Sequence, residues 1–330
     1  MTAPPRRLLL AIDAPSLLHR NHHARAHTGI TDRAGRPAWA LDGMLRQILE
    51  AIDSFAPDAL LFGLDDREAS LRRDHYPDYK SGRAEKHPQL IEQLERAGAL
   101  LDSLGLLSIT PSGLEADDVS ASAAAWAERE GWNCVIVTSD RDAFAHISEH
   151  TQVLRLITGG IGGSPLLNPR RLHAMYGVCA ANYLSFAALR GDASDNLPGV
   201  PGLGDKTAAA LLAAAGPMES IWADIEHNAG AGVAAALDDW SLEAGGRRIG
   251  TSVVRRLAAD GARERYDFNV SMMRGHDNLE LGLTPEVPHS PGLLPLPLER
   301  VDRVVGWLNV PATADLARRV LVADPASRSS

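Results

Sequence analysis

The stretch RLLLAID, residues 7–13, is a short apolar run that ends in a carboxylate. Two later runs repeat this form, DALLFGLD at residues 58–65 and VIVTSD at residues 135–140. Short apolar runs separated by helical patterns are typical of buried strands in βαβ units. We therefore expect an α/β fold with a mostly parallel sheet flanked by helices.

Helical patterns fill the segments between these runs. Residues 40–55 carry apolar side chains at helical spacing, and residues 88–105 begin with proline and end with glycine. After about residue 165, strand patterns give way to Ala-rich helical segments. The remaining predicted elements are strands at residues 106–110 and 151–157, and helices at residues 115–131, 141–147, 168–176, 180–190, 204–215 and 301–319.

The composition is that of a soluble globular chain. Its 330 residues are 45% hydrophobic and 23% charged, which fits two domains or one large domain with an appendage. No apolar run is long enough to predict a membrane span. Two cysteines, Cys134 and Cys179, form no disulfide framework and fit a reducing cytoplasm. The net charge of −9 argues against a nucleic-acid partner, although a total can hide a local basic stripe.

Acidic residues follow four of the predicted strands. Because the carboxyl ends of parallel strands share one edge of a sheet, these acids should lie close together. Each of them alone could be a turn residue or a helix cap. Together they predict a site for Mg²⁺ or Mn²⁺, since clustered carboxylates repel one another and hard oxygen ligands select these ions. The acids are Asp13, Asp65, Glu115, Asp117, Asp118, Asp140 and Asp142.

A second acidic pair precedes a glycine-rich turn. Asp192 and Asp195 are three residues apart and can share one face of a helical turn. The sequence LPGVPGLGDKT follows at residues 197–207, and a helix is expected to start near Gly204. Glycines allow backbone N–H groups to approach a ligand, and a helix N-terminus beside Lys206 suits a DNA phosphate.

These motifs resemble those of the bacterial 5′-nuclease (flap endonuclease) family, which includes the N-terminal nuclease domain of DNA polymerase I. Their order and spacing agree over residues 7–220, and we expect a stand-alone member because no polymerase sequence follows. The motifs are Asp13, YPDYKSGR at residues 76–83, EADD at 115–118, TSDRD at 138–142 and GDASDNLPGVPGLGDKT at 191–207.

The resemblance implies a division of the chain into three parts. Residues 1–165 would form a PIN-like catalytic domain, with a helical arch at about residues 68–88. Residues 166–284 would form a helical part with a helix-hairpin-helix module at about residues 181–215. Residues 285–330 form the third part: the composition of residues 285–297 is Pro-rich and predicts an extended linker or surface loop, and a C-terminal helical extension follows.

The resemblance also implies roles for individual residues. Asp13, Asp65, Glu115 and Asp117 resemble ligands of a first metal ion, and Asp118, Asp140, Asp142, Asp192 and Asp195 resemble those around a second. Lys80 and Arg83 look like the pair that contacts the scissile phosphate. The implied DNA contacts are Arg20, Arg72, Arg73, Tyr76, Tyr79, Lys86, Gly199, Gly202, Gly204, Lys206 and Thr207, with K⁺ as a further ligand of the hairpin. His19 and Pro201 depart from the family pattern, at positions where Tyr and a basic residue are frequent.

The expected function is that of a structure-specific 5′–3′ exonuclease and flap endonuclease in DNA replication and repair. Two metal ions would hydrolyse phosphodiester bonds in DNA with 5′ flaps or 5′ ends, and RNA primers on DNA are a related substrate. The chain is expected to be a monomer in the bacterial cytoplasm, near the nucleoid. Two alternatives remain open, a catalytically weak protein that binds branched DNA and a PIN-like ribonuclease. The complete acid set favours the enzyme, and the hairpin favours duplex DNA.

Overall fold

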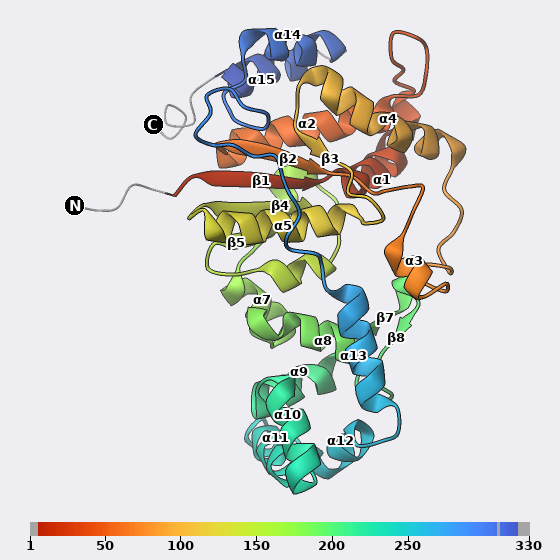
Figure 1. Cartoon of the computed structure of the whole chain (residues 1–330), viewed down its shortest axis with the longest axis vertical. Coiled ribbons are helices and arrows are strands. Elements are labelled where there is room, and N and C mark those ends of the chain that lie inside the picture. Colours follow the sequence, from red (N-terminus) through yellow and green to blue (C-terminus); the bar gives the residue numbers. More distant parts are fainter. Residues whose placement is uncertain (1–5, 309–310, 323–330) are drawn as a thin grey trace, which may run out of the picture.

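The computed structural model describes residues 6–308 and 311–322 and has the expected α/β architecture (Figure 1). Its main sheet has six strands in the order β3-β2-β1-β4-β5-β6. All neighbouring strands are parallel except β5 and β6, which are antiparallel. The strands are β1 (Leu8–Asp13), β2 (Ala59–Gly63), β3 (Ser108–Ile109), β4 (Asn133–Thr138), β5 (Thr151–Arg155) and β6 (Leu166–Leu167).

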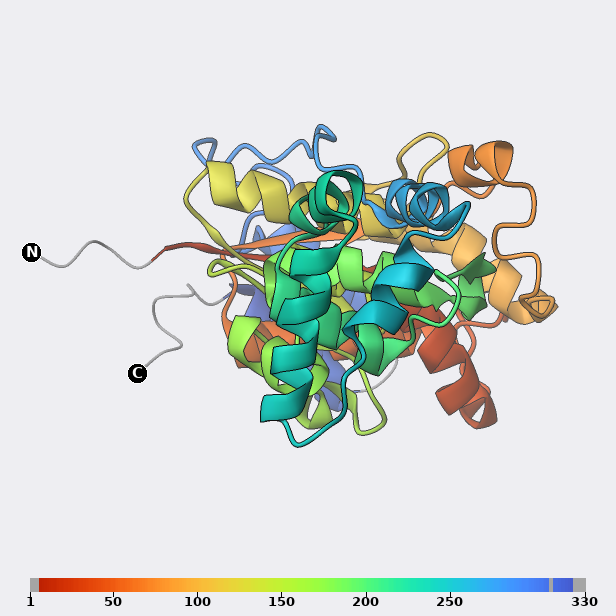
Figure 2. The ribbon, with the colours of Figure 1, turned by 90° about the horizontal axis from the view of Figure 1, so that it is seen from below.

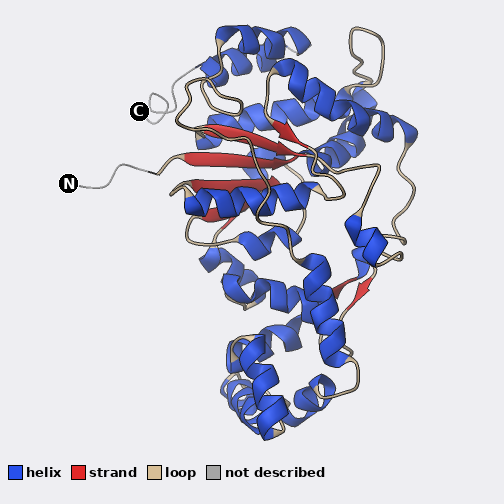
Figure 3. Ribbon diagram, viewed as in Figure 1, coloured by secondary structure: helices blue, strands red, loops and turns tan. Residues whose placement is uncertain are grey.

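Helices cover both faces of this sheet (Figure 3). Along β1, Leu10 and Ile12 pack into one hydrophobic cluster, while Leu9 and Ala11 pack into another on the opposite face. A strand buried on both sides must be apolar at every position, which is why β1 shows no alternation. The helices of this half are α1 (Ala14–Arg25), α2 (Trp39–Phe55), α3 (Leu71–His75), α4 (Pro88–Leu104), α5 (Ala116–Arg129) and α6 (Gly160–Gly163), with 3₁₀ turns η1 (Ala26–Thr28) and η2 (Asp142–His146).

Residues 169–273 are mostly helical and lie below the sheet in Figure 1; Figure 2 views the molecule from that end. Tyr183 and Phe186 belong to the same hydrophobic cluster as Phe144 of the sheet domain, so the core is continuous between the two halves. A two-stranded antiparallel ribbon, which the sequence patterns did not predict, lies in this half. The ribbon consists of β7 (Gly191–Asp192) and β8 (Leu197–Pro198). The other elements of this helical part are α7 (Pro169–Tyr176), η3 (Ala180–Asn182), α8 (Tyr183–Arg190), η4 (Ala193–Asp195), α9 (Asp205–Ala215), α10 (Met218–Asn228), α11 (Ala231–Glu243), α12 (Gly250–Leu257) and α13 (Ala262–Met273).

The Pro-rich segment expected as a linker or surface loop is docked along β2. The Leu60 N–H donates to the carbonyl of Gly292 at 2.7 Å, and the Leu294 N–H donates to that of Asp58 at 2.8 Å. Because β3 has only two residues, the first half of β2 would otherwise leave backbone groups unpaired. The chain then forms two helices where one was expected, α14 (Leu298–Trp307) and α15 (Pro311–Val322). They contact α4 and α2, respectively.

No helix in residues 6–308 and 311–322 is both long enough and apolar enough to cross a membrane.

Replacing Leu294 with Ala should destabilise the protein, because this buried side chain holds the docked segment against β2. We expect the free energy of unfolding to fall by about 2–4 kcal/mol in a denaturant titration. Leu298→Ala is the matched control, since Leu298 is 67% exposed and its loss should change stability by less than about 0.5 kcal/mol. Equal, small effects of both substitutions would show that the segment is a detached linker.

Candidate active site

The carboxyl edge of the sheet brings most of the predicted acids together. Asp13 is the last residue of β1, Asp65 follows β2, and Asp140 follows β4. Electrostatic repulsion links these three acids with others from α5, η2 and the β7–β8 ribbon. The group that interacts in this way is called the acid cluster below and comprises Asp13, Asp65, Asp117, Asp140, Asp142, Asp192 and Asp195.

Asp13 is fixed at the centre of this cluster by local hydrogen bonds. It caps the N-terminus of α1 by accepting from the Ser16 N–H at 2.9 Å. Its second oxygen accepts from the Thr138 hydroxyl at 2.6 Å. Burial, together with the negative charges of Asp65 and Asp140, nevertheless raises the pKa of Asp13 to about 7. Thr138 was not identified from the sequence, because a threonine at a strand end carries no pattern of its own.

Two further carboxyls in the cluster have raised pKa values. Burial and the neighbouring charges of Asp140 and Asp195 raise the pKa of Asp142 to about 8. Burial and the charges of Asp140 and Asp13 raise the pKa of Asp117 well above its ordinary value. At neutral pH these groups cannot all be charged unless cations compensate them. The edge of the sheet is therefore a site that favours cation binding.

Glu115 faces positively charged groups of the arch. One carboxylate oxygen accepts from the Lys80 ammonium at 2.7 Å. The other accepts from the Tyr79 hydroxyl and from the Arg72 guanidinium, both at 3.1 Å. Burial disfavours the charge of Glu115, but Lys80 and Arg72 outweigh it and lower the pKa of this carboxyl.

Asp118 is fully buried and forms an ion pair with Arg72. The guanidinium donates to both carboxylate oxygens at 2.8 Å. The backbone N–H groups of Glu115 and His276 donate to the same oxygens at 2.9 and 3.0 Å. Arg72 also donates to the carbonyl of Met272, and its side chain is only 12% exposed. Arg72, predicted as a DNA contact, thus serves here as an internal counter-ion.

The arch is fastened to the β7–β8 ribbon. The Lys80 N–H donates to the Asp195 carbonyl at 3.1 Å, and the Arg83 guanidinium forms an ion pair with the Asp195 carboxylate. Asn196 follows in a left-handed conformation (φ 59°), and its amide donates to the carbonyl of Asp78 at 3.1 Å. The structural role of Asn196 was not predicted from the sequence, although asparagine is one of the few non-glycine residues that tolerate this conformation.

A cavity of about 340 Å³ lies between the arch and the acid cluster. Three acids are part of its lining, namely Asp65, Asp66 and Glu115. Five cations line it as well, namely Arg67, Arg73, Lys80, Arg83 and Lys86. An anion that enters this space meets positive charge from the arch and the acids of the sheet edge at once.

Tyr76 and Tyr79 are less available for base stacking than predicted. Tyr79 is only 5% exposed, and the Lys80 ammonium lies 4.7 Å from its ring centre. Tyr76 is half-buried and packs its edge on Phe268, with ring centres 5.3 Å apart. Arg20, also predicted as a DNA contact, lies on α1 and is half-buried.

The glycine-rich turn precedes α9 and requires glycine at two positions. A Cβ on Gly199 would lie 2.1 Å from the carbonyl oxygen of Arg190. Gly202 has a φ of 79°, which L side chains rarely adopt. Gly204 caps α9, the Lys206 side chain is exposed in its first turn, and Thr207 is half-buried.

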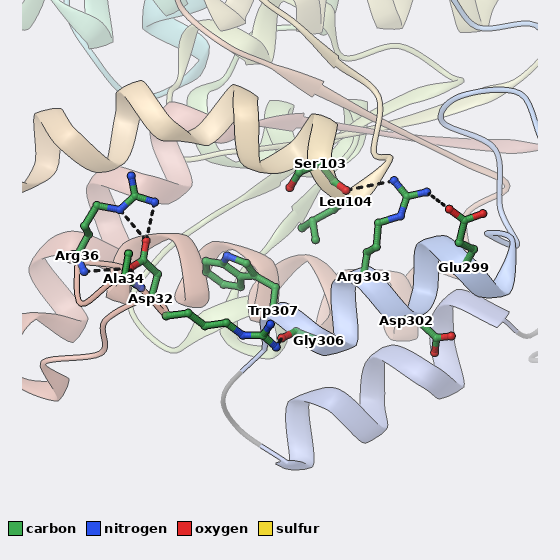
Figure 4. Close-up of a pocket in the computed structure, with 11 residues that line it drawn as sticks. Asp32, Ala34, Arg36, Ser103, Leu104, Glu299, Asp302, Arg303, Gly306 and Trp307 are labelled. Carbon is green, nitrogen blue, oxygen red and sulfur yellow. Dashed lines mark hydrogen bonds and ion pairs between the residues drawn. The ribbon is translucent and has the colours of Figure 1, made fainter.

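A second cavity, of about 810 Å³, lies between residues 32–36, the end of α4 and α14 (Figure 4). Its charged groups compensate one another. Arg36 pairs with Asp32 at 2.9 Å. Arg303 pairs with Glu299 at 2.8 Å. This cavity shares no lining residue with the acid cluster and is a separate feature.

Within residues 6–308 and 311–322, no group of three or more His, Cys, Asp or Glu side chains is arranged to hold a metal ion as it lies. The contacts above account for this arrangement. Glu115 and Asp195 are turned toward Lys80 and Arg83, and Asp13 is turned toward Thr138. The acids are close enough to repel one another, but Asp13, Glu115 and Asp195 are oriented by a protein hydroxyl or by protein cations.

Solved structures with a similar fold include the T5 5′-exonuclease with bound zinc ions and the catalytic core of Rad2 in complex with DNA substrate. The first has a TM-score of 0.55 at 17% identity and covers 81% of this chain and all of that one. The second has a TM-score of 0.54 at 16% identity and covers 96% of this chain and 93% of that one. At these identities the likeness concerns the fold alone.

The sequence comparisons identify the family. The thermostable DNA polymerase I of Thermus filiformis is 36% identical over 224 residues, which is 68% of this chain and 26% of that protein. This chain therefore matches about a quarter of the length of that relative. Residues 8–177 match the 5'-3' exonuclease N-terminal resolvase-like domain, and residues 178–244 match the 5'-3' exonuclease C-terminal SAM fold. The chain belongs to the 5'-3' exonuclease family.

Proposed function

We propose that the chain is a metal-dependent 5′–3′ exonuclease and flap endonuclease that hydrolyses phosphodiester bonds of DNA. The observation that carries this proposal is the cavity lined by five cations of residues 67–86 and by Asp65, Asp66 and Glu115, at the acid cluster. A phosphodiester fits both the cations and the acids of this site. The cations can neutralise its negative charge, and metal ions held by the acids would assist its hydrolysis. Membership of the 5'-3' exonuclease family supports the same reaction.

The donor set fits hard divalent cations, and we propose Mg²⁺ or Mn²⁺. All of its members are carboxylates, and burial together with mutual repulsion raises the pKa of Asp13, Asp117 and Asp142. The T5 5′-exonuclease, which shares the fold, binds divalent metal ions. When bound, such ions activate water and neutralise charge on the leaving oxygen. The residues that would hold them are Asp13, Asp65, Glu115, Asp117, Asp140, Asp142, Asp192 and Asp195.

Asp118, also predicted as a ligand, has a different role in this proposal. Both of its oxygens are occupied by Arg72 and by two backbone N–H groups. We propose that Asp118 holds Arg72 in place and that Arg72 in turn orients Glu115.

Lys80 and Arg83 would bind the phosphate beside the cleaved bond. Burial disfavours their charges, but Glu115 and Asp195 outweigh it and raise the pKa of Lys80, and Asp195 does the same for Arg83. Both side chains therefore stay cationic. Divalent ions at the acids would release these cations from their carboxylate partners, so that they can pair with DNA instead.

The rest of the substrate would lie over the glycine-rich turn. Exposed Lys206 at the start of α9 suits a phosphate of duplex DNA, and we propose DNA with 5′ flaps or 5′ ends, including RNA-primed ends, as the partner of a monomer. The complex of Rad2 with DNA substrate supports DNA binding by this fold.

Asp117→Asn and Asp142→Asn should each abolish most cleavage, because each removes a ligand charge from the acid cluster. With a 5′-labelled flap substrate, we expect single-turnover rates to fall by about 10²–10³-fold while DNA binding is retained. Asp74→Asn, an exposed acid of the arch, is the matched control and should cleave normally. Near-normal rates for both cluster variants at saturating Mg²⁺ and Mn²⁺ would exclude the assignment of these acids as metal ligands, whereas a wild-type protein that binds the flap substrate without cleaving it would favour the branched-DNA-binding alternative.

Lys80→Ala and Arg83→Ala should lower the single-turnover rate by about 10²–10³-fold, since each removes a preorganised cation from the reacting phosphate. Lys206→Ala should instead weaken binding and reduce the slope of log affinity against log salt by about one, with little change in rate at saturating enzyme. The measurement is cleavage rate against enzyme concentration at two ionic strengths. The placement of the arch is wrong if Lys80→Ala and Arg83→Ala lose affinity only.

Stability of the protein in a chelator should fall as the pH rises from about 5.5 to 7.5. Folding raises the pKa of Asp13 to about 7 and that of Asp142 to about 8, so these groups keep protons that the unfolded chain has released. Each such proton lowers the free energy of unfolding by up to about 1.4 kcal/mol per pH unit across this window. Mg²⁺ or Mn²⁺ should flatten or reverse the slope, as seen by denaturant titration. An identical slope in Asp142→Asn would contradict the assignment to that residue.

A further inference from the structure

A cavity of about 610 Å³ lies between α7, α9 and α11. Ala209 and Ala210 of α9 are part of its lining, Tyr176 lines it from α7, and Trp240 lines it from α11. These three helices follow one another down the helical part in Figure 1. The cavity has the size and the mainly apolar, aromatic lining that are typical of a ligand site.

Two apolar side chains of this cavity are exposed to solvent. Met175 is 49% exposed and Trp240 is 40% exposed, so both keep apolar surface in contact with water. Tyr176, by contrast, is held in place, because its ring packs on those of Tyr183 and Phe186 with ring centres 5.7 and 6.0 Å apart. A fixed phenol ring and an exposed indole in one cavity offer flat apolar surface to a planar ligand.

Positive charge borders the same cavity. Arg141 and Lys206 are both part of the lining, and Lys206 lies in the first turn of α9. Asp205 also lines the cavity, but it lies 3.7 Å from the Arg190 guanidinium, which offsets its charge. The cavity therefore favours an anionic group beside its aromatic walls.

Arg141 places the cavity next to the acid cluster. It lies between two members of that cluster in the sequence, Asp140 and Asp142. Burial disfavours the charge of Asp192, but hydrogen bonds and the charges of Arg190 and Arg141 outweigh it and lower the pKa of this carboxyl. One end of the cavity thus belongs to the loop of the acid cluster and the other to the first turn of α9, so a DNA strand that joins these two sites can reach it.

We propose that this cavity binds one unpaired nucleotide of the DNA substrate, with the base on Trp240 and a phosphate between Arg141 and Lys206. Bases within a duplex stack on one another and hide their faces, so an unpaired base is the one that can present a flat surface to the indole. Stacking on an aromatic side chain accepts every base, and neighbouring cations bind the backbone. This inference rests on the proposed function, because a 5′ flap places an unpaired nucleotide next to a duplex.

The test is an abasic scan of a fluorescent 5′-flap substrate, in which one base at a time is removed on either side of the junction. Binding is measured by anisotropy in a chelator, so that no cleavage occurs. For the wild-type protein we expect one unpaired position whose abasic form binds at least about fivefold more weakly, as loss of a stacked base does. Trp240→Ala should show the same loss on the complete substrate and no further loss on that abasic one, because both changes remove one contact.

A 2-aminopurine base at that position reports the stacking directly, since its fluorescence is quenched when the base stacks. We expect quenching by the wild-type protein, most of it by Trp240→Phe, which keeps an aromatic ring, and none by Trp240→Ala. Leu242→Ala is the matched control and should bind and quench like the wild type. Leu242 lies on the same helix, is 44% exposed and is not part of the cavity lining.

The possible failures are distinguishable. The inference is overturned if no unpaired position is coupled to Trp240, if the sensitive base is a paired one, or if Trp240→Ala weakens the binding of fully paired duplex as much as that of the flap. The proposed function survives these outcomes, since cleavage at the acid cluster does not require the cavity. A wild-type protein that neither binds nor cleaves the flap would contradict the proposed function and, with it, this inference.

Discussion

Repulsion among the carboxylates at the carboxyl edge of the sheet is the constraint on which the rest of the structure depends. Parallel strands that end together bring Asp13, Asp65 and Asp140 to one place, and burial removes the water that would screen them. Folding therefore has to supply positive charge or protons. Arg72, Lys80 and Arg83 supply the charge by pairing with Glu115, Asp118 and Asp195, and raised pKa values show that protons supply the remainder.

The same ion pairs connect segments that are distant in sequence. Arg72 joins α3 to α5 and, through the Met272 carbonyl, to the end of α13. Asn196 joins the β7–β8 ribbon to the arch. Cations at the acid cluster would weaken the arch-to-acid pairs but leave the Asn196 contacts intact, since these use neutral groups. The arch would then be freed on the side that faces the acids and stay fastened on the side of the ribbon.

Local patterns in the sequence were sufficient for the elements that form this edge. Each predicted strand of the core is present, because a strand buried on both faces must be apolar and its terminal acid is visible in the sequence. The β7–β8 ribbon, the docking of Gly292 along β2 and the inward turn of Arg72 could not be predicted, since each depends on partners 40 or more residues away or on strands only two residues long. For the site, residue type and order indicated the acids, but which cation pairs with which acid is decided by tertiary packing.

The net charge of −9 illustrates the same limit in another way. Taken as a whole-chain property it argues against DNA binding, yet charge of one sign gathers locally, as acids do in the acid cluster and as arginines do in residues 247–274. Salt screens charges over about 10 Å at ordinary ionic strength, so a phosphate at the glycine-rich turn would respond mainly to nearby groups such as Lys206 and hardly to remote carboxylates. Opposite local fields also serve opposite tasks: the acids can attract metal ions while the arginines attract the DNA backbone. In a chain that has both an acidic and a basic site, the net charge therefore does not reveal either of them.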